Sequence, residues 1–457
     1  MKLLSQIHAR FGDFWWYTGL QFVASRCGDL INAFIGLWLV PKYVGMEELG
    51  AVLPLASFAL AIAFPLSAFT GAFNKQVNVL TLNREWGKLK TLLRGVFIAG
   101  FLFVVLGVLA VKLCMPWVLE RVRVAKGALG VAIIASSLLC SVAPVYLNTL
   151  QSMKRFKAVS LINLFGAPIR LVAMLVAMPI RALTGYFVGQ SAGPAFQAVA
   201  SVIALRKELG PLVKAETFWT RPMVVWFFRY MGLIALGGFA GMIVSFVEPL
   251  IIRQRLPELD SAAYYMISRF AEVGSYFGMT LSLIVFPYAS ESAEKGCSDN
   301  GLIVKSMVGS VGFGVLCAIG FGVVGRIVLR LLPNGESFVG YVPELVALTL
   351  ILAAKFSIVC FVNAESAACR FTWLWWMIPV NVVYAASLYV LTGCEYFRGV
   401  LPDVVVDALV SVHAGRLDFL LGMMGLVNFL QIGFIVIHLV GRWRMSLNRI
   451  AISSCHD

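Results

Sequence analysis

Charged residues are scarce in this sequence. They make up 13% of its 457 residues, whereas hydrophobic residues make up 60%. A soluble globular chain is about half apolar and about a quarter charged, so this composition excludes an ordinary soluble protein. The net charge of +14 would suit a nucleic-acid-binding protein, but a chain with a mean hydropathy of +0.87 has little polar surface to present to a duplex. We therefore expect a multi-pass membrane protein that binds no nucleic acid.

The residue patterns of catalysis and metal binding are missing as well. The sequence contains no HExxH or P-loop motif. Its nine cysteines are an odd number and lie mostly inside apolar runs, which argues against a secreted disulfide framework. The four histidines lie far apart, without metal-site spacing, at positions 8, 413, 438 and 456. The only loose group of external acids that a membrane enzyme could use is Asp403, Asp407 and Asp418. We expect no enzyme, no catalytic residue, no metal and no resident cofactor.

Long apolar runs, in contrast, are abundant. A membrane-spanning helix needs roughly 20 apolar residues. Breaking the runs at charge clusters and turn residues predicts an all-α membrane protein with about twelve spans. These fall near 17–40, 49–73, 95–113, 127–150, 158–180, 182–205, 229–252, 264–289, 303–326, 344–362, 371–393 and 417–441.

The basic residues predict the orientation of these spans. With the N-terminus in the cytoplasm, the inside segments hold 21 of the 37 lysines and arginines, as the positive-inside rule requires. The loop 112–126 dissents, because it is basic yet assigned to the outside. An even number of spans puts both termini in the cytoplasm. The first run is too long for a signal peptide and contains Arg26 and Asp29, so we expect a multi-pass protein of a bacterial cytoplasmic (inner) membrane.

Twelve spans divide into two sets of six, which predicts an N-terminal bundle over 1–210 and a C-terminal bundle over 211–457. The junctions after spans one and seven support a parallel repeat. Residues 39–52 and 251–265 both run from apolar to basic, then through a proline or glycine turn to two acids. Chance similarity between two short loops is the alternative.

Three segments resemble polysaccharide-type flippases of the multidrug/oligosaccharidyl-lipid/polysaccharide (MOP) superfamily, the Wzx-type transporters. They are PKYVGMEELGAV at 41–52, LQSMKRFKAVSLINLFGAPIRL at 150–171 and SAAYYMISRFAEVGSYFGMTLSLIVFPYASE at 261–291. The resemblance implies two six-helix bundles around a central cavity, through which lipid-linked sugars pass from the cytoplasmic to the periplasmic leaflet. Peptidoglycan-precursor flippases of the superfamily usually have fourteen spans, which disfavours that branch.

Charges inside spans are the residues that point to a site, because each costs roughly 2.5–3.5 kcal/mol at a helix centre. Arg26 and Asp29 lie close to the middle of span one and share one helix face. They form either a site where the arginine attracts a substrate pyrophosphate or an intrahelical pair that only stabilises packing. Arg269 and Glu272 repeat this spacing on span eight.

Three further charges complete the predicted cavity. Glu248 precedes Pro249, which can open the helix locally, whereas Arg253 and Arg255 just beyond are expected to extend to the membrane interface. Arg170 and Lys355 have no acidic neighbour on their own helices, so each needs a distant partner or an anionic ligand. The predicted substrate- or ion-binding residues are Arg26, Asp29, Arg170, Glu248, Arg269, Glu272 and Lys355.

The residues leave three functions open. Three bases at mid-depth (Arg26, Arg170 and Lys355) against one acid (Asp29) favour an anionic cargo, namely a polyprenyl-pyrophosphate-linked oligosaccharide. The alternatives are a cation-coupled multidrug exporter of the same superfamily and a non-transporting partner of a polysaccharide assembly complex. An H⁺ or Na⁺ gradient is a candidate driving force. Expected partners are the anionic lipid-linked substrate, membrane lipids, and a polysaccharide polymerase and glycosyltransferases.

Overall fold

The computed structural model is helical throughout the part of the chain that it describes, and no strand occurs there. This confirms the predicted all-α class. The described residues are 26–95, 113, 116, 119–120, 129–153, 155–210, 214, 216–294, 300–392 and 417–453. Residues 96–112 of the expected third span, most of the dissenting basic loop and all of the external loop 394–416 lie outside these residues.

Contacts along the chain separate two compact units, unit 1 over Met1–Phe239 and unit 2 over Ala240–Asp457. Helix α9 (Arg221–Arg255) contributes residues to both. The domain boundary expected after residue 210 stays a prediction.

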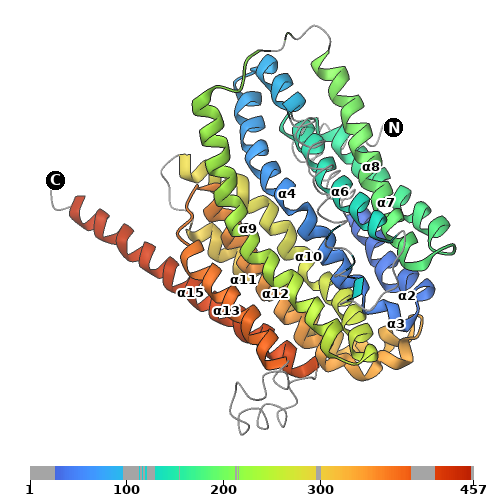
Figure 1. The fold of residues 1–457 in the computed structure, drawn as a ribbon. Helices are drawn as coiled ribbons and strands as arrows, with labels where there is room; N and C mark the ends of the chain where they lie inside the picture. Colours follow the sequence, from blue (N-terminus) through green and yellow to red (C-terminus); the bar gives the residue numbers. More distant parts are fainter. Residues whose placement is uncertain are drawn as a thin grey trace, which may run out of the picture. The chain divides into compact units, whose positions relative to one another are not determined.

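Unit 1 is built around α8, on which α6 and α7 both pack, while α4 packs on α6 (Figure 1). The described part of unit 1 begins with helical residues 26–34, followed by a π-helical turn. A further helix covers residues 86–95. The other elements of this unit are the π turn Ile35–Leu39, α2 (Val40–Tyr43), α3 (Met46–Leu49), α4 (Val52–Leu82), α6 (Leu129–Ser152), α7 (Phe156–Ala177) and α8 (Ala182–Leu209).

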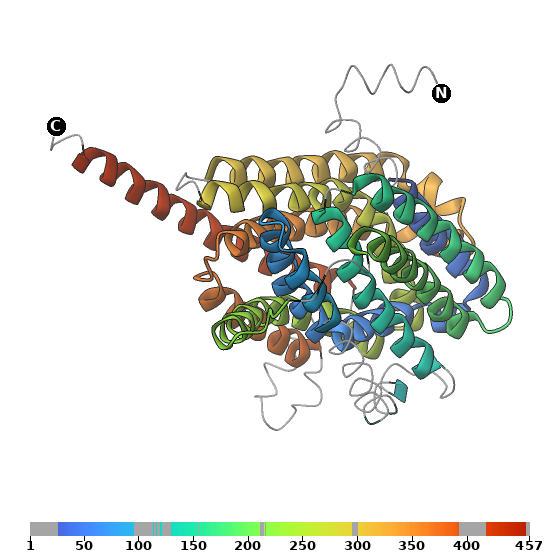
Figure 2. The same ribbon diagram turned by 90° about the horizontal axis from the view of Figure 1, so that it is seen from above.

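Unit 2 is built around α12, which packs on α10, α11 and α15. Figure 2 shows α10 and α11 side by side, in yellow and gold. After the end of α9, its elements are α10 (Glu258–Glu294), α11 (Asn300–Arg330), the 3₁₀ helix Gly335–Tyr341, α12 (Val342–Ala367), α13 (Leu374–Thr392) and α15 (Leu417–Ser453).

Seven helices of the described residues are long and apolar enough to cross a membrane. They coincide with the expected spans near 158–180, 182–205, 229–252, 303–326, 344–362, 371–393 and 417–441. Helices also occupy the expected spans near 49–73, 127–150 and 264–289, as well as the described part of the first span. The chain is therefore a multi-pass membrane protein.

Several helices extend beyond the predicted spans. The expected linker 74–94 is mostly helical, because α4 continues to Leu82 and a new helix begins at residue 86. Phe73, Val77 and Leu80 keep one face of this extension buried, so packing continues the helix past its most apolar part. Helix α9 likewise begins at Arg221 rather than near 229.

Small residues let the helices of each unit approach closely. A Cβ atom added to Gly193 of α8 would lie 2.8 Å from the carbonyl oxygen of Gly166 on α7. In unit 2, a Cβ on Gly314 of α11 would lie 2.1 Å from the Cβ of Ala353 on α12. Close approach at small residues is typical of helices that pack in a membrane.

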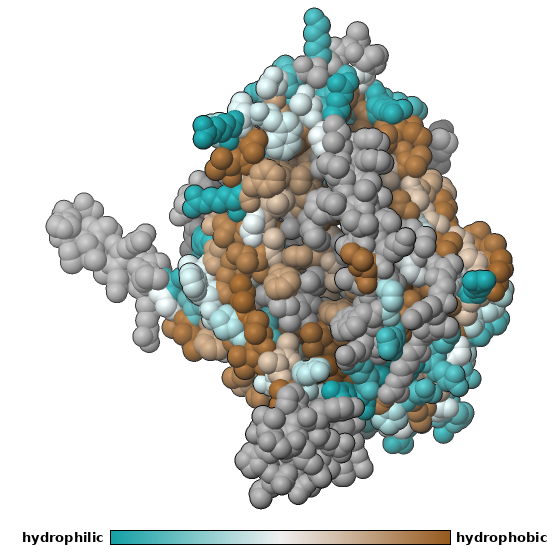
Figure 3. All heavy atoms as spheres, in the orientation of Figure 1, coloured by the Kyte–Doolittle hydropathy of each residue, from teal (hydrophilic) through white to brown (hydrophobic). Residues whose placement is uncertain are grey.

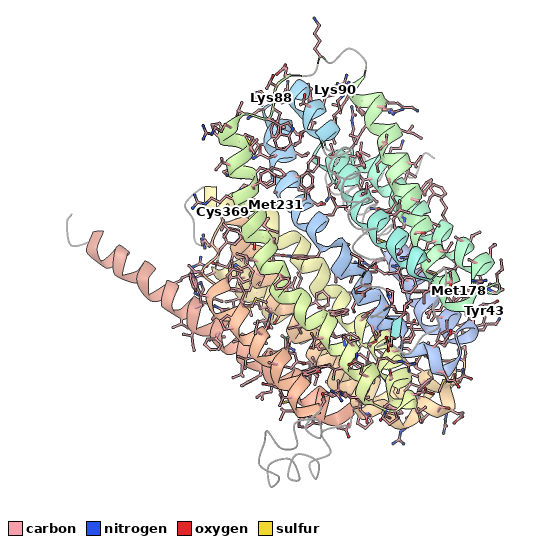
Figure 4. All side chains as sticks on the ribbon, viewed as in Figure 1. Tyr43, Lys88, Lys90, Met178, Met231 and Cys369 are labelled. Carbon is pink, nitrogen blue, oxygen red and sulfur yellow. The ribbon has the colours of Figure 1, made fainter. Side chains whose placement is uncertain are left out.

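Hydrophobic side chains cover the exposed helix flanks. On α11, Leu316, Val323 and Ile327 are each more than half exposed, as expected of a surface in contact with lipid. In Figure 3 such hydrophobic residues are brown. Hydrophilic residues (teal) gather at the upper end, where Figure 4 labels Lys88 and Lys90, and again at the lower right.

Candidate functional site

The first group of predicted site residues lies in unit 1. The Nη1 atom of Arg26 is 3.0 Å from Oδ2 of Asp29, one helical turn further along. The three-residue spacing places both side chains on one face, and the ion pair forms as expected. The two charges offset each other within one helix, which is the arrangement expected of an intrahelical pair that stabilises packing.

Arg170 of α7 belongs to the same group. It is half-buried, and its guanidinium lies within electrostatic range of the Asp29 carboxylate and of Tyr186 on α8. Its buried Nε atom has no hydrogen-bond partner, and the side chain forms no ion pair at hydrogen-bond distance with any residue the structure describes. Arg26, Asp29, Arg170 and Tyr186 are hereafter the unit 1 cluster.

The crossing of α7 and α8 positions Arg170. Gly166 and Gly193 bring the two backbones together, and a Cβ on Gly193 would lie 3.2 Å from the Cβ of Arg170. Next to this crossing, Gln197 of α8 donates a hydrogen bond to Asn163 of α7, with an Nε2 to Oδ1 distance of 3.2 Å. The local surroundings of Arg170 are thus polar on a helix that is otherwise apolar.

The second group lies in unit 2, around Glu248 of α9. The Glu248 side chain is buried, and its residue is only 7% exposed. The hydroxyl of Tyr384 on α13 donates a hydrogen bond of 2.9 Å to Glu248 Oε1, and Lys355 Nζ on α12 lies 3.6 Å from Oε2. Lys355 therefore has the distant partner that its sequence context required.

Arg269 and Glu272 of α10 lie in the same unit and form a pair, with Nη1 2.9 Å from Oε2. The guanidinium also stacks over the ring of Tyr265, 5.4 Å from its centroid. Tyr264, on the same helix, is within electrostatic range of both Glu248 and Glu272. The two acids thus share one neighbourhood. Glu248, Arg269, Glu272, Lys355 and Tyr384 are hereafter the unit 2 cluster.

The seven predicted residues therefore fall into two groups, three in unit 1 and four in unit 2. Helix α9 runs through Pro249 without a break, and the proline supplies no backbone N–H there. One local expectation is wrong. Arg253 is only 3% exposed rather than extended to the interface, because α9 runs on to Arg255 and keeps Arg253 packed inside the unit.

A buried charge group in unit 2 was not predicted as a site. Glu365, near the end of α12, has no exposed side-chain surface. It contacts Arg442 of α15, and Arg370 Nη1 and His438 Nε2 lie 3.6 and 3.8 Å from its carboxylate oxygens. From sequence Glu365 reads as an ordinary inside acid, because Arg442 lies 77 positions away.

The tyrosines of both clusters were also missed, since a tyrosine in an apolar run carries no sequence signal of its own. Among the described residues, no group of three or more His, Cys, Asp or Glu side chains is arranged to hold a metal ion. What the clusters offer chemically is guanidinium, ammonium, carboxylate and phenol groups inside apolar helices.

No model of a known protein family matches the sequence, and neither does any curated protein. Solved structures do match the fold. A multidrug resistance MATE family transporter of the MOP superfamily, in an inward-facing conformation, aligns with a TM-score of 0.68 at 11% identity, covering 92% of this chain and 96% of the other.

Two other solved structures with different names also match the fold. The lipid II flippase MurJ aligns with a TM-score of 0.56 at 12% identity over 91% of this chain and 87% of its own. A MOP superfamily transporter from Pyrococcus furiosus, described by a binding pocket of reverse polarity, aligns with a TM-score of 0.59 at 12% identity over 94% and 93%. At such identities the likeness establishes the fold alone, and that fold is the one the sequence resemblance implied.

Proposed function

We propose that this protein is a transporter that moves an anionic lipid-linked oligosaccharide across the cytoplasmic membrane by alternating access. The fold supports transport, because its structural neighbours are named as transporters or a flippase. The observation that carries the anionic cargo is Arg170, whose buried Nε lacks a hydrogen-bond partner among the described residues. A pyrophosphate is the group that such an arginine would bind.

The chemistry of arginine suits this cargo. A guanidinium presents several N–H donors in a rigid fork that matches phosphate oxygens, and it stays charged when partly buried. In the unit 1 cluster, Arg26 is paired with Asp29, whereas Arg170 forms no ion pair within the described residues, so its guanidinium is the one offered to the substrate. Asp29 would hold Arg26 in place until the pyrophosphate competes for it.

The unit 2 cluster is balanced, with Arg269 and Lys355 against Glu248 and Glu272. Balanced pairs suit ion coupling better than anion binding, because protonation of either acid would release its base. We infer that Asp29, Glu248 or Glu272 couples transport to H⁺ or Na⁺. Each elementary charge moved across the membrane contributes roughly 2.3 kcal/mol per 100 mV.

One observation favours a second candidate, cation-coupled multidrug export. The buried carboxylate of Glu248 beside Tyr384 is an acid–aromatic arrangement that attracts organic cations. Lys355 already neutralises this carboxylate, however. The unit 1 cluster, with one acid and two bases, has no excess of negative charge to attract a cation. The transporter from Pyrococcus furiosus is a structural neighbour for which a pocket of reverse polarity suggested a different function.

The test is a flipping assay in proteoliposomes. The probe is a fluorescent polyprenyl-pyrophosphate-linked disaccharide, and the readout is the rate at which the label becomes accessible to a membrane-impermeant quencher. We expect Arg170→Gln to lower this rate at least tenfold and Arg170→Lys to retain part of it. The matched control is Arg181→Gln, an exposed arginine at the turn between α7 and α8, which should flip normally.

Normal flipping by a well-reconstituted Arg170→Gln protein would remove the anion site from unit 1. Uptake of a cationic dye with no flipping of the lipid probe would replace the proposal with multidrug export. Absence of both activities in the wild-type protein would favour the non-transporting partner, whose candidate associates are a polysaccharide polymerase and glycosyltransferases.

A further inference from the structure

A pocket at one end of unit 1 lies outside both charge clusters. It has a volume of about 490 Å³ and is formed by helix 86–95, α6 and α8. The floor includes Tyr146 and Leu205, which belong to the hydrophobic core that these helices share with α7. Figure 4 labels Lys90 at this end of the unit. The pocket is therefore an opening over a packed core rather than a gap between loose segments.

The rim of the pocket is basic. Lys90, Arg94 and Arg206 line it, and none of the described lining residues is acidic. The nearest acid along α8, Glu208, is engaged by Arg155. Arg94 and Arg206 are exposed, and neither forms an ion pair within the described part of the chain. Three like charges around one opening repel one another, so an anion bound among them would stabilise the arrangement.

The third base is held in place by the end of α8. Lys90 Nζ donates a hydrogen bond to the carbonyl oxygen of Gly210, at 3.2 Å. Gly210 has a φ of 51°, a left-handed conformation that favours glycine and ends the helix. This contact ties helix 86–95 to α8 and keeps the lysine beside the pocket.

We propose that this pocket binds the phosphate-bearing headgroup of an anionic phospholipid. Basic pockets between helices at a membrane surface are suited to such headgroups. Helix α8 is a candidate membrane span that ends at Leu209, so the rim stands at the level where a helix leaves the bilayer.

The surroundings favour a lipid over a free phosphate ion. Below the rim on α8, Val199 and Ile203 are 60% and 52% exposed, which offers an apolar track for acyl chains beside a charged site for the headgroup. Tyr146, Leu205 and Leu209 make the floor apolar, and an apolar floor gives a small hydrated anion few partners. This site shares no residue with either charge cluster, and the proposal does not depend on the proposed function.

The experiment uses the purified full-length protein in detergent, with native mass spectrometry to count bound lipid. Phosphatidylglycerol is the probe, phosphatidylcholine is the neutral comparison, and inorganic phosphate is the free anion. We expect phosphatidylglycerol to bind the protein at lipid-to-protein ratios at which phosphatidylcholine does not bind. The double variant Arg94→Gln/Arg206→Gln should weaken phosphatidylglycerol binding about tenfold.

The matched control is Lys207→Gln. Lys207 is exposed and adjacent to Arg206 but does not line the pocket, so this variant should bind like the wild type. The charge-retaining variant Arg94→Lys/Arg206→Lys should keep most of the affinity, which separates loss of charge from misfolding. Equal binding by the double variant and the wild type would overturn the proposal. So would full displacement of the lipid by millimolar inorganic phosphate, which would make the pocket a site for free anions.

Discussion

At Glu365, a fully buried carboxylate is surrounded by Arg370, Arg442 and His438. A buried charge is tolerable only when partners offset its desolvation, and removing one side of such a group leaves the others uncompensated. The same reasoning applies to Glu248, which pairs with Lys355 and accepts a hydrogen bond from Tyr384. At the scale of single residues, unit 2 thus depends on two buried acids whose partners come from other helices.

We expect Glu365→Ala to destabilise the protein by about 3–5 kcal/mol, because it leaves two arginines next to each other without their carboxylate. Thermal unfolding of the purified protein in detergent measures this. The control is Glu336→Ala. The Glu336 side chain is 80% exposed and pairs with the likewise exposed Arg330 at the surface, so this variant should unfold like the wild type. Equal unfolding temperatures for the two variants would show that the buried group is not structural.

We expect Lys355→Met to lower stability by more than the double variant Glu248→Gln/Lys355→Met does. The single change leaves the buried Glu248 carboxylate with the Tyr384 hydroxyl but without its cation, whereas the double change removes both charges and keeps a hydrogen-bonding partner for that hydroxyl. A double-mutant cycle by thermal unfolding gives the coupling energy. Additive effects would mean that the 3.6 Å pair contributes nothing.

Between helices, close packing at glycine decides the geometry. In unit 2, α11 and α12 approach at Gly314 and Ala353. In unit 1, α7 and α8 approach at Gly166 and Gly193, one turn from Arg170. The elements that hold the charges are therefore placed by residues that carry no charge themselves.

Gly314→Ala should destabilise the protein by about 1–3 kcal/mol, because the added Cβ would lie 2.1 Å from the Cβ of Ala353 and the helices would have to separate. Gly312→Ala, two residues away on the same helix, meets nothing within 4 Å and should be neutral or slightly stabilising. Chemical or thermal unfolding in detergent compares the two. A neutral Gly314→Ala would show that α11 can shift without cost.

For the whole molecule, the distribution of charge along the chain predicts orientation. Basic residues concentrate in the segments assigned to the cytoplasm, including residues 84–94 and 206–221. The turn at residues 331–334, between α11 and the following 3₁₀ helix, is assigned to the opposite side. Orientation decides which membrane face supplies the cargo and which leaflet supplies the lipid of the proposed pocket.

Reporter fusions test the orientation. An alkaline phosphatase fused at residue 457 should be inactive, since both termini are predicted to lie in the cytoplasm, whereas one fused after residue 332 should be active. A green fluorescent protein at the same positions should give the reverse pattern. Activity of the phosphatase at residue 457 would contradict the predicted cytoplasmic position of the C-terminus.

The all-α class, the approximate positions of the helices and the charges inside the spans followed from the sequence alone. They depend on local composition, since about twenty apolar residues in a row form a helix whatever their neighbours. The i, i+3 pairs at Arg26–Asp29 and Arg269–Glu272 were predictable for the same reason, because one helical turn sets their geometry. The continuity of α9 through Pro249 and the burial of Arg253 were not, because both depend on what packs against that helix.

Only the tertiary structure decided which charge meets which. Glu248 and Lys355 lie on α9 and α12, and Glu365 and Arg442 on α12 and α15, so no sequence spacing links them. The same holds for the basic pocket, whose arginines come from helix 86–95 and from α8. The physical reason is that a helix sets the order of side chains on its own faces, whereas contacts between helices are set by the small residues and packing surfaces that bring those faces together.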